Sequence, residues 1–322
     1  MAATSADVSY LRFFLHKDTD EVLLARKRIG PRCASIPEIR ELRTLLRLMV
    51  EHGIQKIRLT GEDPAERTDL PELISLIAGI DGIREVAMST AGLGLTERVG
   101  ELAQRGLQSI SFHLDTLKPE RFRQITGQDA FAEVWSAVEQ SLAAGLTVKI
   151  NTVLQRGLND DEIDDLVALT RERPIQVRFV EWNTCVERVA EPENFVSVHE
   201  AMSAIKQPLI PQKSRGIDGP ALVYDIPTHA GSVGFIPNIT EHFCGACNRI
   251  GLTDHGEITS CLFGRGLSLI RHLRSPSGVS SVSDFIERVL RRKVLLSARL
   301  EGYATAPTLV SSPSMEIPGL TE

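Results

Sequence analysis

Three cysteines near the C-terminal end of the chain have a spacing that suits metal or redox chemistry. Cys244 and Cys247 form a C-x-x-C pair, which can direct two thiolates at one metal. Two short apolar runs, separated by a turn at Gly256, follow this pair and predict a hairpin that brings Cys261 back beside it. We therefore predict that Cys244, Cys247 and Cys261 bind one metal centre.

The three thiolates suit two different occupants. A structural zinc takes four ligands, and His242 or His255 would supply the fourth. An iron-sulfur cluster held by only three cysteines keeps one iron open to a substrate atom. A redox-inert pair of buried thiols is a third interpretation, but it is uncommon for a C-x-x-C pair with a further cysteine nearby. The residues alone leave zinc and iron-sulfur open.

Positively charged residues interrupt apolar runs that we expect to be strands. They are Arg12, Lys56, Lys149 and Arg178. Because an unpaired cation is costly to bury, each needs an anionic partner. That partner is either a carboxylate at a strand end, such as Asp115 or Glu181, or a bound triphosphate, which several converging cations would recognise.

The chain between residues 10 and 180 alternates strand-like and helix-like segments. The expected strands span residues 10–15, 54–60, 85–89, 109–114, 147–154 and 175–180. The expected helices span residues 36–52, 70–78, 95–104, 119–125, 131–144 and 160–171. This rhythm predicts right-handed βαβ units and a parallel sheet. Since a closed barrel has about eight such units, we predict an α/β fold with a partial, open (β/α)6 TIM-like barrel and functional groups at the C-terminal ends of its strands.

The rhythm breaks after residue 180, which indicates a second module. We predict a barrel over residues 9–183 and a C-terminal extension over residues 184–303 that carries the three-cysteine site. The extension is expected to contain helices at residues 196–205 and 282–293 and strands at residues 222–226 and 232–236. Residues 304–322, rich in Pro, Ser and Thr, are expected to be extended or mobile.

The composition excludes several classes of protein. With 322 residues, 42% of them hydrophobic, the chain can bury a large core. A net charge of -6 gives no overall positive field for nucleic acid or an anionic membrane. No apolar run approaches the roughly 20 residues of a membrane span, and the N-terminal MAATSADVSY has no leader pattern, so we expect a cytoplasmic protein. Five unevenly spaced cysteines favour a metal site over a disulfide framework.

Six segments, in order, resemble one known family. They are YLRFFL, KIRLTGEDP, LDTLKPERFRQITG, VKINTVLQRGLNDDEI, VRFVEW and GFIPNITEHFCGACNRIGLTDHGEITSCLF. They are similar to the GTP 3′,8-cyclases (MoaA) of molybdenum cofactor biosynthesis, which are radical S-adenosylmethionine proteins, and the match covers roughly residues 9–263. The resemblance implies an incomplete barrel with an N-terminal 4Fe-4S cluster that cleaves S-adenosylmethionine. It also implies a second 4Fe-4S cluster, on three C-terminal cysteines, that binds the guanine of GTP.

The resemblance assigns roles to individual residues. It implies that Cys244, Cys247 and Cys261 hold a 4Fe-4S cluster, which favours iron-sulfur over zinc. It implies contacts with the phosphates, ribose and base of GTP by Arg12, Lys56, Ser89, Lys149, Arg178 and Arg249. One further arginine of the family is Gly251 here, so we expect a change in nucleotide affinity or in the choice of base.

Most positions at which this chain departs from the family are positions that bind S-adenosylmethionine or its cluster in that family. The family places C-x-x-x-C-x-x-C after the first strand, where this chain has Thr19, Leu23 and Arg26. Cys33 can supply only one thiolate, so we predict that this cluster is absent. Radical initiation needs an iron that binds the methionine moiety and delivers an electron to the sulfonium. We therefore do not expect S-adenosylmethionine as a cofactor.

Three further positions on the same side of the site are altered. The family's Gly-Gly-Glu-Pro, which receives the methionine amino group, reads Gly-Glu-Asp-Pro at residues 61–64. A serine that contacts the ribose is His113 here, and a methionine after the sixth strand is Asn183. His113 is either an acid or base or, more often for a strand histidine, a satisfied interior group.

We predict an iron-sulfur protein with one 4Fe-4S cluster that binds a purine nucleotide such as GTP and has lost radical chemistry. One alternative is an active GTP 3′,8-cyclase, a lyase, which the overall resemblance favours and the missing cysteines oppose. Another is a non-radical enzyme that uses the open iron as a Lewis acid, with His113 or a nearby carboxylate as base. A homodimer or a separate protein partner is compatible with all three, whereas nucleic acid and membrane are not expected.

Overall fold

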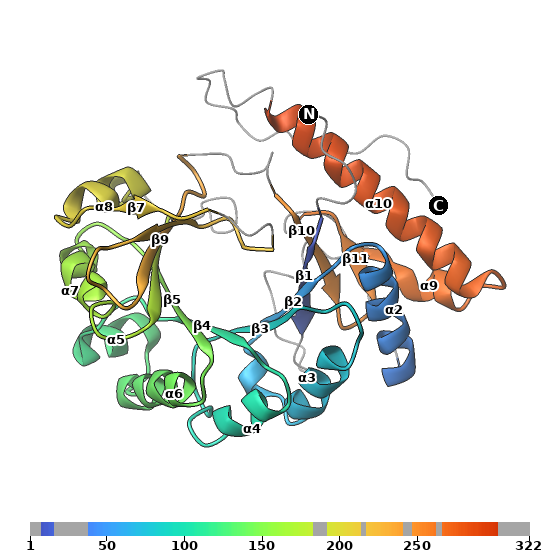
Figure 1. Cartoon of the computed structure of the whole chain (residues 1–322), viewed down its shortest axis with the longest axis horizontal. Helices are drawn as coiled ribbons and strands as arrows, with labels where there is room; N and C mark the ends of the chain where they lie inside the picture. Colours follow the sequence, from blue (N-terminus) through green and yellow to red (C-terminus); the bar gives the residue numbers. More distant parts are fainter. Residues whose placement is uncertain are drawn as a thin grey trace.

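The computed structural model describes residues 8–15, 38–182, 192–213, 217–240, 247–261 and 266–301. These residues build one sheet of 12 strands. The sheet curves into an open barrel with helices along its outer side (Figure 1). The predicted α/β fold with a partial barrel is confirmed.

Six parallel strands form the middle of the sheet and follow one another in chain order. They are β1 (Tyr10–Leu15), β2 (Lys56–Gly61), β3 (Glu85–Thr90), β4 (Ser109–His113), β5 (Thr147–Val153) and β6 (Ile175–Val180). All six predicted strands are confirmed, and their ends lie within a few residues of the predicted ones. A local pattern of apolar residues is enough to locate them because their helix-facing sides are almost entirely apolar.

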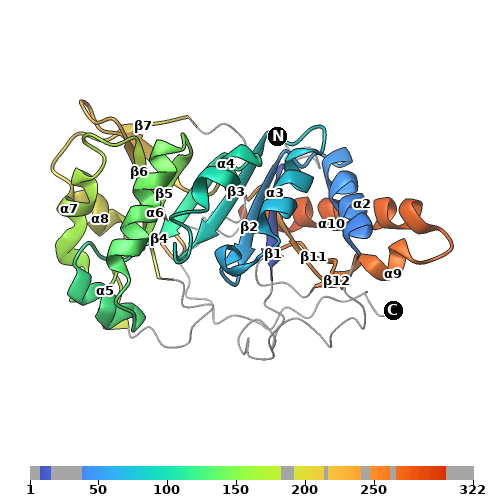
Figure 2. The ribbon, with the colours of Figure 1, turned by 90° about the horizontal axis from the view of Figure 1, so that it is seen from below.

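Helices between these strands cover the outer side of the sheet (Figure 2). They are α2 (Ile39–Glu51), α3 (Leu70–Ala78), α4 (Val99–Gln104), α5 (Pro119–Thr126), α6 (Phe131–Ala143) and α7 (Ile163–Ala168), with short 3-10 turns η2 (Pro64–Glu66) and η3 (Asp160–Glu162). The predicted helix at residues 95–104 starts only at Val99. The loop before it is tied to α6, because Gly94 N donates to Glu133 Oε1 (2.7 Å) and the Thr96 hydroxyl to the Glu133 carbonyl (3.4 Å).

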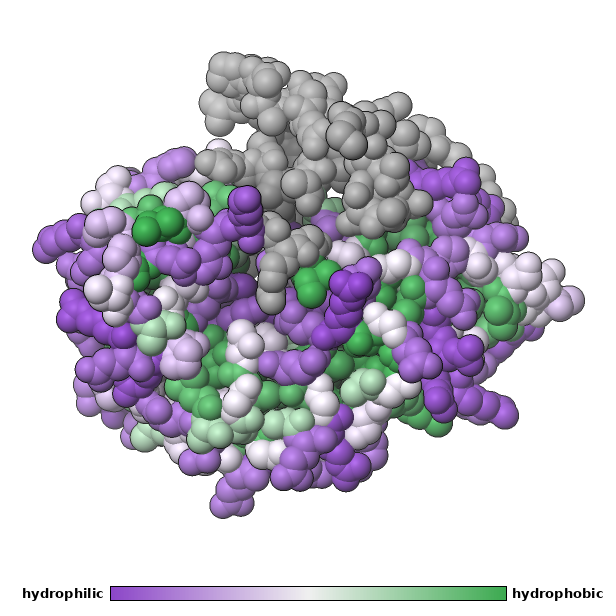
Figure 3. All heavy atoms as spheres, viewed as in Figure 1, coloured by the Kyte–Doolittle hydropathy of each residue, from purple (hydrophilic) through white to green (hydrophobic). Residues whose placement is uncertain are grey.

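Alternate side chains of each strand face the helices and form the core. Leu11 and Phe13 in β1 are fully buried there, as are Ile57 and Leu59 in β2. Because side chains alternate along a strand, the residues between them face the inner side of the barrel. The space-filling view shows apolar residues in a band between strands and outer helices, with hydrophilic residues over the outside (Figure 3).

The C-terminal extension continues the same sheet at both edges. At one edge β9 (Ser232–Ile236) pairs in parallel with β6, and β8 (Leu222–Asp225) and β7 (Ile210–Pro211) follow it in antiparallel order. At the other edge β10 (Arg249–Thr253) pairs in parallel with β1, followed by antiparallel β11 (Glu257–Thr259) and β12 (Leu267–Ser268). The extension therefore shares its sheet with the barrel, while the predicted boundary at residues 183 and 184 lies outside the described residues.

The extension also supplies η4 (Pro192–Asn194), α8 (Val198–Ala204), α9 (Leu269–Leu273) and the long α10 (Gly278–Glu301). The helix predicted over residues 282–293 is α10, which is longer at both ends. It packs beside α9 and α2 through buried Val282, Ile286 and Leu290. No helix in the described ranges is long and apolar enough to cross a bilayer. The cytoplasmic location stays a prediction, and the tail at residues 304–322 lies outside the described residues.

Candidate functional site

The register of the sheet brings charged residues of neighbouring strands side by side. Arg12 in β1 lies opposite Arg58 in β2. Tyr10, two residues earlier in β1, lies opposite Lys56 in β2 and Arg249 in β10. All five positions alternate with core residues, so they share the inner face of the barrel.

The six residues that the resemblance assigns to GTP all occupy this inner face. They are Arg12 in β1, Lys56 in β2, Ser89 in β3, Lys149 in β5, Arg178 in β6 and Arg249 in β10. Their side chains influence one another directly, since the charges of Lys56 and Arg178 both lower the pKa of Lys149. The fold therefore gathers positions that are far apart in the sequence into one positively charged surface.

Lys56 has a carboxylate partner inside the barrel. Its side chain is 1% exposed, and its Nζ lies 2.8 Å from Glu85 Oε1 on β3. The same ammonium lies 5.1 Å from the centre of the Tyr10 ring. Burial alone would raise the pKa of Glu85, but the charge and hydrogen bond of Lys56, together with the charges of Lys149 and Arg58, outweigh burial and lower it. This ion pair neutralises one of the converging cations.

Arg58 is a central residue of this surface that sequence analysis missed. Its guanidinium is 5% exposed and donates to Ser89 Oγ (3.0 Å) and Ser111 Oγ (2.8 Å). It also donates to the Tyr10 hydroxyl at 2.5 Å. Strand alternation was the available signal, because Arg58 stands two residues after Lys56 and must face the same side.

Lys149 is buried among cations without an anion of its own. Its side chain is 5% exposed, and within the described residues it makes no hydrogen bond or ion pair. Burial lowers the pKa of Lys149 to about 6, and repulsion by Arg178, Lys56 and Arg58 adds to this effect, against a weaker opposing effect of Glu85. A bound anion would relieve both the burial and the repulsion.

Two arginines of the inner face also have lowered pKa values. Burial lowers the pKa of Arg12 and of Arg178 to about 10 each, with further lowering of Arg12 by Arg249 and of Arg178 by Arg58. Arg178 Nε donates to Gln176 Oε1 at 2.5 Å. Arg12 Nε is buried and has no acceptor within the described residues. Among the described residues, the inner face thus has a hydrogen-bond donor without an acceptor, Arg12 Nε, as well as excess positive charge.

The carboxylates Asp115 and Glu181, the alternative partners for these cations, serve the backbone instead. Asp115 Oδ1 accepts from Val153 N at 2.7 Å, and burial raises its pKa. Glu181 accepts from Val198 N (2.9 Å) and Ile239 N (2.8 Å). The interpretation that Asp115 and Glu181 neutralise the strand cations is therefore wrong, because both carboxylates are committed to loop backbone.

The predicted hairpin between the cysteines is confirmed. β10 and β11 pair in antiparallel register, with Gly251 opposite Thr259, and the chain turns at Gly256 with φ 74°. Cys247 precedes β10 and Cys261 follows β11, so both lie at the same end of this hairpin. Both are free thiols. Cys244 and His242 lie outside the described residues, and within the described part no three Cys, His, Asp or Glu side chains form a metal-binding group.

Cys247 lies in a positively charged environment. Burial raises the pKa of its thiol, but Arg249 and Lys293 outweigh burial and lower it to about 7. Lys293 Nζ donates to Cys247 Sγ at 3.3 Å. A cysteine that deprotonates near neutral pH is suited to metal ligation, since the thiolate is the ligating form.

Gly251 has no room for the arginine that the resemblance implies at this position. A Cβ added to Gly251 would lie 2.3 Å from Thr259 Oγ1 and 2.8 Å from Phe14 Cε2. The ring of Phe14 and the hydroxyl of Thr259 thus take the space beside the strand. A larger side chain at residue 251 would require Phe14 and Thr259 to move.

The loop at residues 61–64 is fixed by its own side chains. Asp63 Oδ2 accepts from Thr90 Oγ1 (2.9 Å) and Ala91 N (2.6 Å), and Oδ1 accepts from Ala65 N (3.0 Å). His113, the last residue of β4, lies close enough to this loop for the charge of Asp63 to affect it. Desolvation lowers the pKa of His113, Asp63 opposes this, and Arg58 and Arg12 add to the lowering. Thr19, Leu23, Arg26, Cys33 and Asn183 lie outside the described residues.

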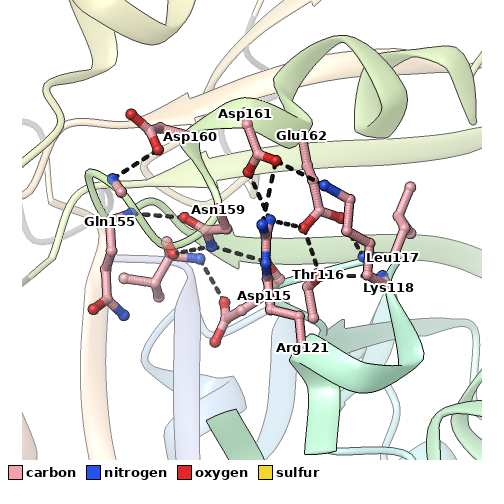
Figure 4. Close-up of polar contacts among 12 residues, drawn as sticks. Asp115, Thr116, Leu117, Lys118, Arg121, Gln155, Asn159, Asp160, Asp161 and Glu162 are labelled. Carbon is pink, nitrogen blue, oxygen red and sulfur yellow. Dashed lines mark hydrogen bonds and ion pairs between the residues drawn. The ribbon is translucent and has the colours of Figure 1, made fainter. Parts of the chain in front are cut away.

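A polar network joins the two loops that follow β4 and β5 (Figure 4). Glu162, fully buried, accepts from Thr116 Oγ1 (2.6 Å) and Leu117 N (2.7 Å) and pairs with Arg121. Asn159 Nδ2 donates to the carbonyl of Asp115 at 2.7 Å. These bonds tie the two loops together, and they account for the polar residues of the segments LDTLKPERFRQITG and VKINTVLQRGLNDDEI that take part in them.

Two family models match the chain in succession. The Radical SAM superfamily model matches residues 25–170, and the Molybdenum Cofactor Synthesis C model matches residues 175–295. Among solved structures, Streptococcus suis SuiB has a TM-score of 0.51 at 12% identity, covering 79% of this chain and 60% of that chain. At that identity the likeness concerns the fold alone.

Curated relatives agree with both family models. The chain is 36% identical to the GTP 3′,8-cyclase of Pelotomaculum thermopropionicum, over 83% of this chain and 84% of that protein. It is 38% identical to the GTP 3′,8-cyclase of Moorella thermoacetica, over 72% of each chain. It is 35% identical to Molybdenum cofactor biosynthesis protein 1 of Drosophila melanogaster, over 79% of this chain but only 46% of that protein. The resemblance found in the sequence is thereby confirmed, and the chain belongs to the GTP 3′,8-cyclase family of the Radical SAM superfamily.

Proposed function

We propose that this family member binds a purine nucleoside triphosphate, GTP or a close analogue, on the inner face of its barrel. Lys149, Arg178 and Arg12 meet the phosphates, and the base lies toward the hairpin that carries Cys247 and Cys261. The names of the relatives support a guanine nucleotide, because those proteins are named as cyclases of GTP.

The main observation behind this proposal is that Lys149 is buried among other cations. A lysine that is 5% exposed, surrounded by Arg178, Lys56 and Arg58, destabilises the ligand-free protein unless something offsets its charge. A triphosphate supplies several negative charges and strong acceptors in one ligand. Arg12 Nε, which is buried without an acceptor in the described residues, points to the same conclusion.

We also propose one 4Fe-4S cluster on Cys244, Cys247 and Cys261. The donor set fits, because two of its members lie at the same end of one hairpin and the thiol of Cys247 has a lowered pKa of about 7. When bound, such a cluster supplies an open iron that can coordinate an atom of the base. The chain's own contribution is to hold the thiolates and to orient the nucleotide through its cations.

The cluster that would cleave S-adenosylmethionine does not fit this chain. Thr19, Leu23 and Arg26 stand where the family has three cysteines, and hydroxyl, alkyl and guanidinium groups do not replace thiolate ligands of iron. The single nearby thiol, Cys33, cannot hold a cluster by itself. We therefore propose that the protein binds a nucleotide without radical cleavage of S-adenosylmethionine.

The second candidate is an active GTP 3′,8-cyclase. It is favoured by the identity of 36–38% to two proteins of that name. The two functions differ in one product, because radical cleavage of S-adenosylmethionine releases 5′-deoxyadenosine. Anaerobic protein reduced in the presence of GTP and S-adenosylmethionine should bind GTP and release no 5′-deoxyadenosine, whereas catalytic release would establish the cyclase. Absence of any saturable binding of a purine nucleotide would overturn the proposed site.

A further inference from the structure

Lys293 of α10 makes a contact with the cysteine site that the proposed nucleotide site does not explain. Its side chain is 6% exposed, and its Nζ donates a hydrogen bond to Cys247 Sγ at 3.3 Å. The two residues come from different parts of the extension, because Lys293 lies in the C-terminal half of the long helix and Cys247 lies two residues before β10. This contact joins the helix to the proposed cluster.

The placement of Lys293 follows from the face of α10 that packs on the protein. Ile286, Val289 and Leu290 are buried on that face, and Lys293 continues it at the helical spacing of three and four residues. A buried ammonium group is unfavourable unless an anionic partner lies beside it. An apolar residue at position 293 would avoid this cost, so the presence of a lysine there needs an explanation. Cys247 is the partner that lies within hydrogen-bond distance.

The neighbouring cations of α10 behave differently. Arg291 is exposed and pairs with Glu287 one turn earlier at 2.6 Å. Arg288 lies over the ring of Phe285, at 5.3 Å from its centre. Both are accounted for by contacts within the helix itself. Lys293 is thus distinguished by its burial and by the sulfur at the end of its side chain.

We propose that Lys293 is a positioning residue for the cluster, which orients the Cys247 thiolate and raises the reduction potential of the cluster that this thiolate holds. The inference rests on the proposed 4Fe-4S site. Reduction adds one electron to the cluster and so makes it more negative. A positive charge and an N–H···S hydrogen bond at a ligating sulfur stabilise the reduced form more than the oxidised form.

The test is a one-electron redox titration of the anaerobic holoprotein, reduced with dithionite and followed by electron paramagnetic resonance. Lys293→Met keeps the length of the side chain and removes its charge and donors. It should lower the midpoint potential, and a tenfold shift of the equilibrium toward the oxidised form corresponds to about 59 mV. Lys293→Arg should restore most of the potential. Arg291→Met removes a charge from the same helix without the sulfur contact and should leave the potential unchanged.

The outcomes separate this inference from the proposed function. If the wild-type protein holds no iron, the proposed cluster fails and the inference fails with it. If the wild-type cluster is present and Lys293→Met has the wild-type potential, only the inference is overturned. Selective loss of iron from Lys293→Met, with iron retained in Lys293→Arg and Arg291→Met, supports it. Loss of iron from all three variants contradicts it, because it means that α10 acts only through its packing.

Discussion

Glu85 forms an ion pair with Lys56 at 2.8 Å inside the barrel, whereas its effect on Lys149, two strands away, is too weak to offset the cations around that lysine. The pair stabilises one cation, whereas the pKa of Lys149 falls to about 6 through burial and the charges around it. Among the described residues, this surface carries more positive than negative charge, which is the basis of the proposed nucleotide site.

Lys149→Ala should weaken binding of GTP. The substitution removes a charge-assisted phosphate contact, which is worth about 1.5–3 kcal/mol, or about 10- to 150-fold in affinity. Binding of guanosine, which has no phosphates, should be unchanged. Titration calorimetry of the anaerobic holoprotein measures both.

Lys118→Ala is the matched control for Lys149→Ala. Lys118 lies in the loop after β4, pairs with Asp161 at 2.7 Å and is 47% exposed, so its loss should leave the affinity for GTP unchanged. Equal weakening by both variants would mean that only the overall charge of the protein attracts the nucleotide.

The affinity for GTP should fall as the pH rises above about 6. In the ligand-free protein Lys149 has a lowered pKa of about 6, and bound phosphates raise this pKa because they stabilise the ammonium. Below pH 6 both forms are protonated and binding is strongest. As the pH rises through the higher, ligand-bound pKa, the ammonium and its contribution are lost.

Calorimetry in buffers of different ionisation enthalpy would detect the proton taken up on binding at pH 7. Lys149→Met serves as the control, because GTP itself also titrates near this pH. The variant should take up less of a proton than the wild type. Identical proton uptake by the two proteins would assign the whole pH dependence to the nucleotide and contradict the role of Lys149.

Glu85→Gln should destabilise the ligand-free protein. Lys56 is 1% exposed, and the substitution leaves its ammonium buried without a carboxylate. Breaking a buried ion pair in this way costs about 3–5 kcal/mol in the free energy of unfolding. The measurement is chemical denaturation without nucleotide. Glu101→Gln, which breaks the exposed pair with Arg105, should change the stability by less than about 1 kcal/mol.

Anaerobic protein should contain about four irons and four sulfides per chain, the composition of one 4Fe-4S cluster. Cys261→Ala should lose the cluster and, with it, recognition of the base, so that GTP and guanosine both bind more weakly. Cys33→Ala is the control and should retain the cluster. Zinc in place of iron would exclude the cluster and leave a structural metal site at the same cysteines.

S-adenosylmethionine should not bind saturably in the micromolar range, which corresponds to about -8 kcal/mol. The ligands of its cluster are replaced at residues 19, 23 and 26. The carboxylate of Asp63 is committed to Thr90 Oγ1, Ala91 N and Ala65 N. Calorimetry with a relative named GTP 3′,8-cyclase as the positive control decides the matter. Saturable binding to this chain would mean that the barrel retains S-adenosylmethionine without the cluster.

The sequence by itself determined the order of the elements and the positions of the six middle strands. It also determined the hairpin between Cys247 and Cys261. These features depend on local signals, namely apolar runs, strand alternation and a glycine at the turn, which act over a few residues. Alternation also places Lys56 and Arg58 on one face once their strand is recognised. The prediction that Thr19, Leu23 and Arg26 stand in place of cluster cysteines also came from the sequence alone.

The tertiary structure alone decided which charges meet. Glu85 rather than Asp115 or Glu181 neutralises a strand cation, because the register between β2 and β3 places it opposite Lys56. Lys293 reaches Cys247, 46 residues away in the chain, because helix α10 folds back against α9 and α2. The extension joins both edges of the barrel sheet because β9 pairs with β6 and β10 pairs with β1. Pairing between distant segments depends on how strands and helices pack in space, and no local pattern in the sequence encodes it.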